Sequence, residues 1–259
     1  MNDSEIYPFF ELGLKREIDA LMEEIGNKLG QGEVYFNKDG FYPYYSVQSK
    51  KILFIGRESR DLGREEDYIH HLLKAYQNKR IYKTHINRHA FHRRLMKISY
   101  GLINGAEWRD IPAASEIAEN FATRKGISFA FMNLSKISNN HENSGHIHVD
   151  FMENVEKTKY YIKKEISILK PDIIIGMNII NSTFKNKKGI LPVKPDDFFD
   201  GAEKPDANNN SLYVGNVCGK KIVYVDSYHF SARNKKDEQD FFDLIKTCLS
   251  TIKNSTVFV

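Results

Sequence analysis

The chain has 259 residues, of which 41% are hydrophobic and 28% are charged, and its formal net charge is +4. These values fit one globular domain with a sizeable core, and no apolar run approaches the roughly 20 residues of a membrane-spanning helix. Two cysteines, Cys218 and Cys248, are too few for a disulfide framework or a four-thiolate cluster. Because the first residues also lack the basic and apolar parts of a secretion signal, we expect a cytoplasmic protein with no membrane partner, no metal and no other cofactor.

The first 50 residues predict a helical lead-in, with one helix near 12–29 followed by the segment DGFYPYY. We expect this lead-in to pack against the rest of the domain and not to form a second one. Beyond it, four short segments are almost continuously apolar, which is typical of strands that are buried on both faces. They are KILFI (51–55), ISFAFM (127–132), DIIIGM (172–177) and KIVYVD (221–226).

Amphipathic helices separate and follow these strands. One stripe at helical spacing consists of Phe91, Leu95, Ile98 and Leu102. Similar stripes occur within 156–170 and 241–252, whereas the acidic, Asn-rich segment 195–210 predicts a surface loop. Strands that alternate with helices indicate an α/β fold. We expect one domain, 1–259, built as a three-layer α/β/α sandwich around a mostly parallel, four-stranded sheet.

Positive charge is concentrated between Arg80 and Lys97, where six Lys/Arg and three His occur without an acidic residue. Two shorter basic stretches lie at 184–194 and 232–236. Each stretch alone is typical of a solvated surface, but together they flank the candidate site loops described below. We therefore expect a face that follows a phosphate backbone, with Arg93 and Arg94 among its contacts.

Polar residues follow each of the four predicted strands. In chain order these junctions read GRESRD, NLSKISNN, GMN and SYHFSARN. Functional groups of parallel sheets gather beyond the carboxyl ends of the strands, so we expect these four segments to form one site.

Taken in order, the junctions resemble the motifs of the uracil-DNA glycosylase superfamily. FIGRESRDLG matches the first motif, a strand that ends in glycine before a carboxylate, with Gly56 and Glu58 at those positions. FAFMNLSK matches the strand that runs into asparagine, here Asn133, and LKPDIIIG matches a further segment of that family. HFSARN, beginning at His229, stands where one branch has His-Pro-Ser-Pro-Arg-Asn. The resemblance spans about residues 50 to 250 and implies a glycosylase-like fold that binds single- or double-stranded DNA.

The resemblance also implies roles that suit the chemistry of these side chains. Glu58 would orient water and stabilise an oxocarbenium-like sugar, and His229 would donate a hydrogen bond to O2 of the departing pyrimidine. Asn133 would read the edge of the flipped base, and Phe91, with Tyr68 as a rival, would stack on it. The remaining assignments place Gly56, Arg60 and Ser231 at the substrate, and Arg233 and Asn234 at the DNA.

Two departures from the family pattern concern the substrate. Ser59 and Arg60 stand where many relatives have Pro-Tyr, whose ring closes the pocket against substituents at carbon 5. Phe230 and Ala232 replace two prolines of the last motif. We therefore expect excision of uracil or of a pyrimidine modified at carbon 5, which includes the bulky cytosines that some superfamily members remove in antiviral defence.

Other interpretations remain open. Taken singly, Glu58 fits a helix cap or an ion pair, Asn133 a turn, His229 a structural histidine and Phe91 a core position. An esterase of the Gly-Asp-Ser type would use Ser59, Asp226 and His229, although Ser59 lies one residue too far from Gly56 for that motif. A catalytically inactive superfamily member that only binds DNA is the third alternative.

Overall fold

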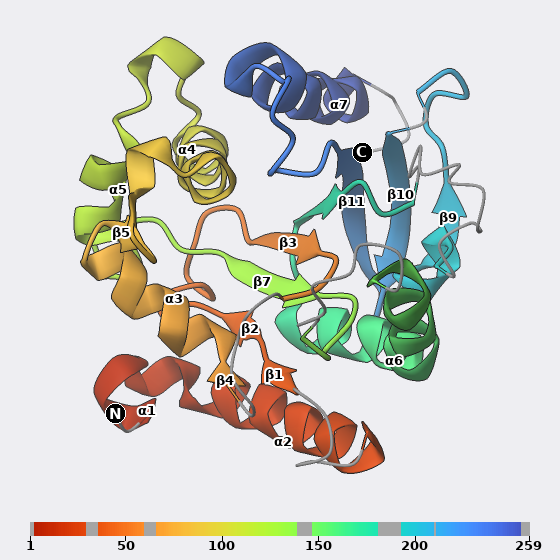
Figure 1. Ribbon diagram of the computed structural model, residues 1–259. Helices are drawn as coiled ribbons and strands as arrows, with labels where there is room; N and C mark the ends of the chain where they lie inside the picture. Colours follow the sequence, from red (N-terminus) through yellow and green to blue (C-terminus); the bar gives the residue numbers. More distant parts are fainter. Residues whose placement is uncertain are drawn as a thin grey trace.

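A mixed β-sheet between two layers of helices forms the centre of the protein (Figure 1). The structure is a computed structural model, and it describes residues 3–29, 36–59, 66–138, 147–180, 193–209 and 211–254. The α/β sandwich predicted from the sequence is therefore confirmed. Among the described helices, none combines the length and the apolar character that a membrane crossing requires.

The sheet has seven strands in the part of the chain that is described, in the order β2-β7-β3-β8-β11-β10-β9. Their bounds are β2 (Gly40–Phe41), β3 (Ile52–Gly56), β7 (Ala130–Asn133), β8 (Ile173–Met177), β9 (Asp200–Glu203), β10 (Leu212–Val217) and β11 (Lys220–Ser227). The four strands β7, β3, β8 and β11 pair in parallel and coincide with the four predicted segments. The expected strand number was wrong, because β2, β10 and β9 extend the sheet with antiparallel pairing.

The segment 195–210 is not simply a surface loop. It contains β9, and it buries Phe198 and Phe199 completely against the sheet. Gly215 on the neighbouring β10 is needed there, because a Cβ atom at this position would lie 2.0 Å from the ring of Phe199. The acidic residues of the segment are exposed along the edge strand, while its two phenylalanines belong to the core.

Both faces of the sheet are covered, which explains why the central strands are apolar throughout. Ile52 and Phe54 point to a first core on one face, and Leu53 and Ile55 point to a second core on the other face, as the period of two in a strand requires. The longer helices are α2 (Leu12–Leu29), α3 (Tyr68–Gln77), α4 (Ala90–Asn104), α5 (Ala114–Asn120), α6 (Ile147–Leu169) and α7 (Asp243–Asn254). Helices α2 and α6 pack on the second core, which places the N-terminal lead-in against the sheet.

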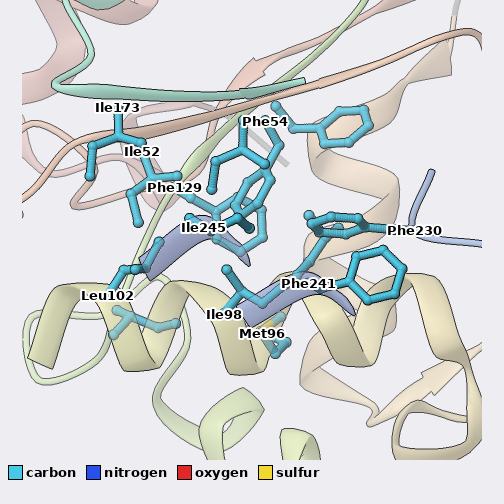
Figure 2. Close-up of a cluster of buried hydrophobic side chains, with 14 of the residues drawn as sticks. Ile52, Phe54, Met96, Ile98, Leu102, Phe129, Ile173, Phe230, Phe241 and Ile245 are labelled. Carbon is cyan, nitrogen blue, oxygen red and sulfur yellow. The ribbon is translucent and has the colours of Figure 1, made fainter. Parts of the chain in front are cut away.

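The first core lies between the sheet and helices α3, α4, α5 and α7. Figure 2 shows its centre, where Phe54 and Phe129 face Ile98 of α4 and Phe241. Phe230, from the segment after β11, also belongs to this core, where its ring packs against Phe54. The start of the HFSARN segment is therefore anchored in the first core.

Short elements connect these layers. They are α1 (Asp3–Ile6), η1 (Phe9–Glu11), β1 (Asn37–Lys38), β4 (Glu66–Asp67), β5 (Arg80–Ile81), β6 (Thr84–His85), η2 (Ile86–Arg88), η3 (Trp108–Asp110), η4 (Pro195–Asp197) and the π-helical turn η5 (Asp237–Phe242). Four of them form two strand pairs: β5 and β6 form a hairpin between α3 and α4, and β1 pairs with β4.

Candidate functional site

The carboxyl ends of the parallel strands open onto one cavity of about 670 Å³. Strand pairing aligns Gly56 with Asn133 and Ser227 with Met177, so the polar residues that follow the strands meet at the same edge. Residues from all four junctions line the cavity, namely Gly56, Glu58, Ser59, Asn133, Asn178, Tyr228, His229, Ser231 and Ala232. The expectation that these junctions form one site agrees with this arrangement.

Asn133, the last residue of β7, lies directly across from Gly56. A Cβ atom at position 56 would approach Oδ1 of Asn133 to 2.6 Å, so glycine makes room for the amide side chain. The backbone N–H of Asn133 donates to the carboxylate of Asp39 at 2.6 Å, and the residue is only 4% exposed. Asp39 therefore fixes the backbone of Asn133 at the cavity, and the missing side chain of Gly56 leaves room for the amide.

Glu58 lines the cavity from the loop that follows β3 and is half-buried. Hydrogen bonds anchor the loop on both sides of it. The carbonyl of Arg57 accepts from the N–H of Ser135 at 2.9 Å, and the hydroxyl of Ser59 donates to the side chain of Asn37. These anchors keep the carboxylate beside the end of β7.

His229 lines the same cavity from the segment that follows β11. Its Nδ1 atom accepts a 3.2 Å hydrogen bond from the backbone N–H of Ser231. A ring nitrogen that accepts carries no proton, so the neutral imidazole holds its proton on Nε2. His229 can therefore act as a hydrogen-bond donor without being charged.

Aromatic rings form a further wall of the cavity. Phe91, at the start of α4, packs against the first core and also lies 5.9 Å from the ring of His229, measured between ring centroids. Tyr68 stacks on Phe131 with a centroid separation of 5.1 Å and an interplanar angle of 21°. Phe91 and Tyr68, the two residues considered for base stacking, thus line the same cavity together with Phe131.

Two histidines, His89 and His92, line the cavity but were not identified from the sequence. Burial lowers the pKa of His92 well below its usual value, and the nearby His89 and His71 act in the same direction. Burial also lowers the pKa of His89. Both rings are therefore neutral at pH 7. The signal that could have identified them is the three-residue spacing of His89 and His92, which places both residues at the start of α4 beside Phe91.

Arg94 does not lie on a DNA-binding surface, and that prediction is wrong. Its side chain is 2% exposed, and its Nε donates to Asp237 at 2.8 Å. Its other nitrogens donate to the carbonyl oxygens of Phe230, Ala232 and Lys235. Arg94 thus fixes the segment that carries His229.

Arg93 shares the same carboxylate. Its Nε donates to Asp237 at 2.7 Å, and its Nη1 donates to the carbonyl of Asn87. Burial of Asp237 would raise the pKa of its carboxyl, but the two arginines hold this pKa below the usual value. The guanidinium of Arg93 is therefore also engaged within the protein, and because its side chain is 28% exposed, its contact with DNA stays a prediction.

Arg233 and Asn234 are exposed beyond the cavity, and Ser231 is exposed at its rim. These positions leave Arg233 and Asn234 accessible to a large ligand. Arg60, which was predicted at the substrate, lies outside the described residues, as do the basic stretch before residue 193 and the loop 139–146.

The residues of the esterase alternative are engaged in other contacts. Oδ1 of Asp226 accepts from the backbone N–H of Ile179 and from the hydroxyl of Tyr224. Nδ1 of His229, which an acid would contact in a triad, accepts from Ser231. Ser59 donates to Asn37. These contacts do not prepare Ser59 as a nucleophile.

The cavity brings together six residues that were singled out from the sequence, namely Gly56, Glu58, Phe91, Asn133, His229 and Ser231. No family model and no curated protein matches the chain.

Proposed function

We propose that the chain is a DNA glycosylase that flips a pyrimidine nucleotide into this cavity and hydrolyses its N-glycosidic bond. The observation that carries the proposal is the meeting of Glu58, Asn133 and His229, from three different strand ends, in one cavity with an aromatic wall. Such a set supplies a carboxylate, a base-reading amide, a neutral donor and a stacking surface. The amide and the stacking surface suit a flipped base, and the carboxylate and the donor suit cleavage of its glycosidic bond.

Glu58 acts on the sugar side of the bond. Its carboxylate stabilises the positive charge that develops on the deoxyribose and orients the attacking water. The hydrogen bonds on either side of it limit the movement of the loop, which favours one position of the carboxylate.

His229 acts on the leaving base. Because its Nδ1 accepts from Ser231, the neutral ring carries its proton on Nε2, and this N–H would donate to O2 of the pyrimidine as negative charge accumulates there. A neutral donor stabilises this charge without transferring its proton completely. Asn133 can donate and accept along the hydrogen-bonding edge of the base.

The substrate class is uracil or a pyrimidine with a substituent at carbon 5, including hypermodified cytosines of phage DNA. The cavity volume of about 670 Å³ supports this breadth, since it lies in the middle of the range for small-molecule pockets and exceeds the needs of one six-membered ring. The neutral rings of His89 and His92 add polar groups that a hydroxylated substituent could meet.

The test is incubation of the protein with oligonucleotides that carry uracil, 5-hydroxymethylcytosine or its glucosylated form. Strand cleavage by alkali after incubation would report an abasic site and identify the base removed. Binding of all three DNAs without any abasic site would indicate a protein that only binds DNA, and hydrolysis of p-nitrophenyl acetate without base release would favour the esterase alternative.

A further inference from the structure

Five of the six cations between Arg80 and Lys97 divide into two sets that face in different directions, and the sixth, Lys97, lies over the ring of Trp108. Arg93 and Arg94 turn toward Asp237 inside the protein. Arg80, Lys83 and Arg88 are exposed on the hairpin β5–β6 and on η2. Only the second set is therefore placed to meet a polyanion.

These exposed cations surround a second concavity of about 640 Å³. It is lined by Arg80, Lys83, Thr84, His85, Asn87 and Arg88, a set without an acidic residue. Nη2 of Arg80 donates to the carbonyl of Lys83 at 3.0 Å, which fixes one cation across the hairpin turn. Within the described ranges, none of the three cations forms an ion pair with a carboxylate. The positive charges of Arg80, Lys83 and Arg88 are therefore accessible to a bound anion.

The same hairpin also contributes a residue to the candidate site, the cavity of about 670 Å³. Tyr82 lies in the turn between Arg80 and Lys83 and lines the cavity that contains Glu58 and His229. Its side chain is 64% exposed, and its φ of 52° lies in the left-handed region. One turn thus presents an aromatic ring to the cavity and cations to the neighbouring concavity.

We infer that the β5–β6 hairpin holds the DNA strand beside the extruded nucleotide. Arg80, Lys83 and Arg88 bind its phosphates in the second concavity, and Tyr82 stacks on a base at the cavity mouth. This inference rests on the proposed function, since it identifies the nucleic-acid contact of the same site. It assigns the phosphate contacts to this hairpin in place of the buried Arg94.

The test is the salt dependence of oligonucleotide binding by the triple variant Arg80→Gln, Lys83→Gln, Arg88→Gln. A matched control, Arg16→Gln, Lys28→Gln, Lys157→Gln, removes the same charge from exposed positions on α2 and α6. Loss of three phosphate contacts reduces the magnitude of the negative slope of log affinity against log salt by about 2 to 3. Loss of long-range attraction between the positive protein and DNA would affect both variants equally. We expect the lower slope and at least about a tenfold loss of affinity at 0.1 M salt only in the hairpin variant. An unchanged slope, or an equal fall in the control, would overturn the inference.

The stacking part is tested by Tyr82→Ala and Tyr82→Phe. Loss of one stacked base weakens binding between about fivefold and a hundredfold, so we expect this loss in the alanine variant and wild-type affinity in the phenylalanine variant. Equal affinity of the two variants would exclude stacking.

Base excision by the wild type separates this inference from the proposed function. Salt-dependent binding through the hairpin without release of any base would overturn the glycosylase proposal alone. Base release with an unaltered slope in the triple variant would overturn the hairpin assignment alone. A wild-type protein that neither binds DNA nor releases a base would overturn both.

Discussion

The backbone N–H of Asn133 donates a 2.6 Å hydrogen bond to the buried carboxylate of Asp39. Asp39 also accepts two hydrogen bonds from Lys136, and Lys136 donates a further hydrogen bond to Glu165 at 2.7 Å. The neighbouring Asn37 accepts from Ser59 and donates its N–H to the carbonyl of Lys136. The N-terminal segment 37–39 therefore connects the loop that carries Glu58 with the strand end that carries Asn133.

Replacing Asp39 with Asn should destabilise the fold and displace Asn133. The change removes the negative charge that balances buried Lys136, and breaking such a pair costs about 3 kcal/mol or more. We expect this loss in urea unfolding, with at least a tenfold fall in kcat/KM for base excision. Asp19→Asn, which breaks the more exposed pair with Lys15, should change the unfolding free energy by less than about 1 kcal/mol. A similar loss in both variants would argue against the role given to Asp39.

Glu165 should make the protein less stable as the pH rises toward about 8. Burial, and then the negative charge of Asp39, raises the pKa of Glu165 to about 8, against the opposing effect of Lys136. The folded state keeps a proton that the unfolded state has released, so this stability is complete below the unfolded pKa and is lost as the pH rises through about 8. Between pH 6.5 and 8 the unfolding free energy should fall by up to about 2 kcal/mol.

Urea unfolding at several pH values measures this effect. Glu165→Gln, a neutral side chain of the same shape, should flatten the pH dependence in that window. Glu24→Gln, which removes an exposed partner of Lys164, should retain the wild-type slope. The assignment fails if Glu165→Gln and the wild type lose stability in parallel.

Gly56→Ala should reduce excision much more than it reduces stability. The added Cβ atom would lie 2.6 Å from Oδ1 of Asn133, a side-chain atom that can rotate away, and the base-reading amide would leave its position. We expect a fall of at least tenfold in kcat/KM and a retained cooperative unfolding transition. Gly13→Ala in α2, where no heavy atom lies within 4 Å, should leave excision unchanged and add up to about 1 kcal/mol of stability. Wild-type excision by Gly56→Ala would show that Asn133 does not depend on this contact.

Arg94→Gln should destabilise the protein without changing the salt dependence of DNA binding. Arg94 bonds Asp237 and three carbonyl oxygens of the segment after β11, so its loss leaves buried acceptors without a partner, at a cost of about 3 kcal/mol. Denaturant unfolding and the slope of log affinity against log salt measure the two effects. A reduced slope together with wild-type stability would restore Arg94 to the DNA surface.

The parallel part of the sheet could be predicted from the sequence because burial on both faces makes its strands continuously apolar. The antiparallel strand β9 was missed for the opposite reason: it has exposed acidic residues along the sheet edge. Only Phe198 and Phe199 indicated that the segment reaches the core, and two aromatic residues in an acidic stretch did not outweigh its polar character.

The strand-end residues of the site were predictable because parallel strands present their carboxyl ends at one edge. The direction of the basic side chains was not predictable. Arg94 turns inward because Asp237 lies 143 residues further along the chain and is buried beside it, and no local pattern indicates such a partner. His89 and His92 did carry a local signal, their three-residue spacing beside Phe91, but their contact with the cavity depends on the packing of α4 against the strand ends.

Release of free base by the wild type and by Glu58→Gln tests the central claim most directly. Each protein would be incubated under single-turnover conditions with DNA that contains uracil or a pyrimidine modified at carbon 5, and the released base would be quantified by mass spectrometry. The wild type should release an intact free base and leave an abasic site, while Glu58→Gln should bind the same DNA with similar affinity and release the base at least a hundredfold more slowly, because the amide cannot stabilise the cationic sugar. Base release by Glu58→Gln at the wild-type rate, or no release by the wild type from any of these DNAs, would contradict the account.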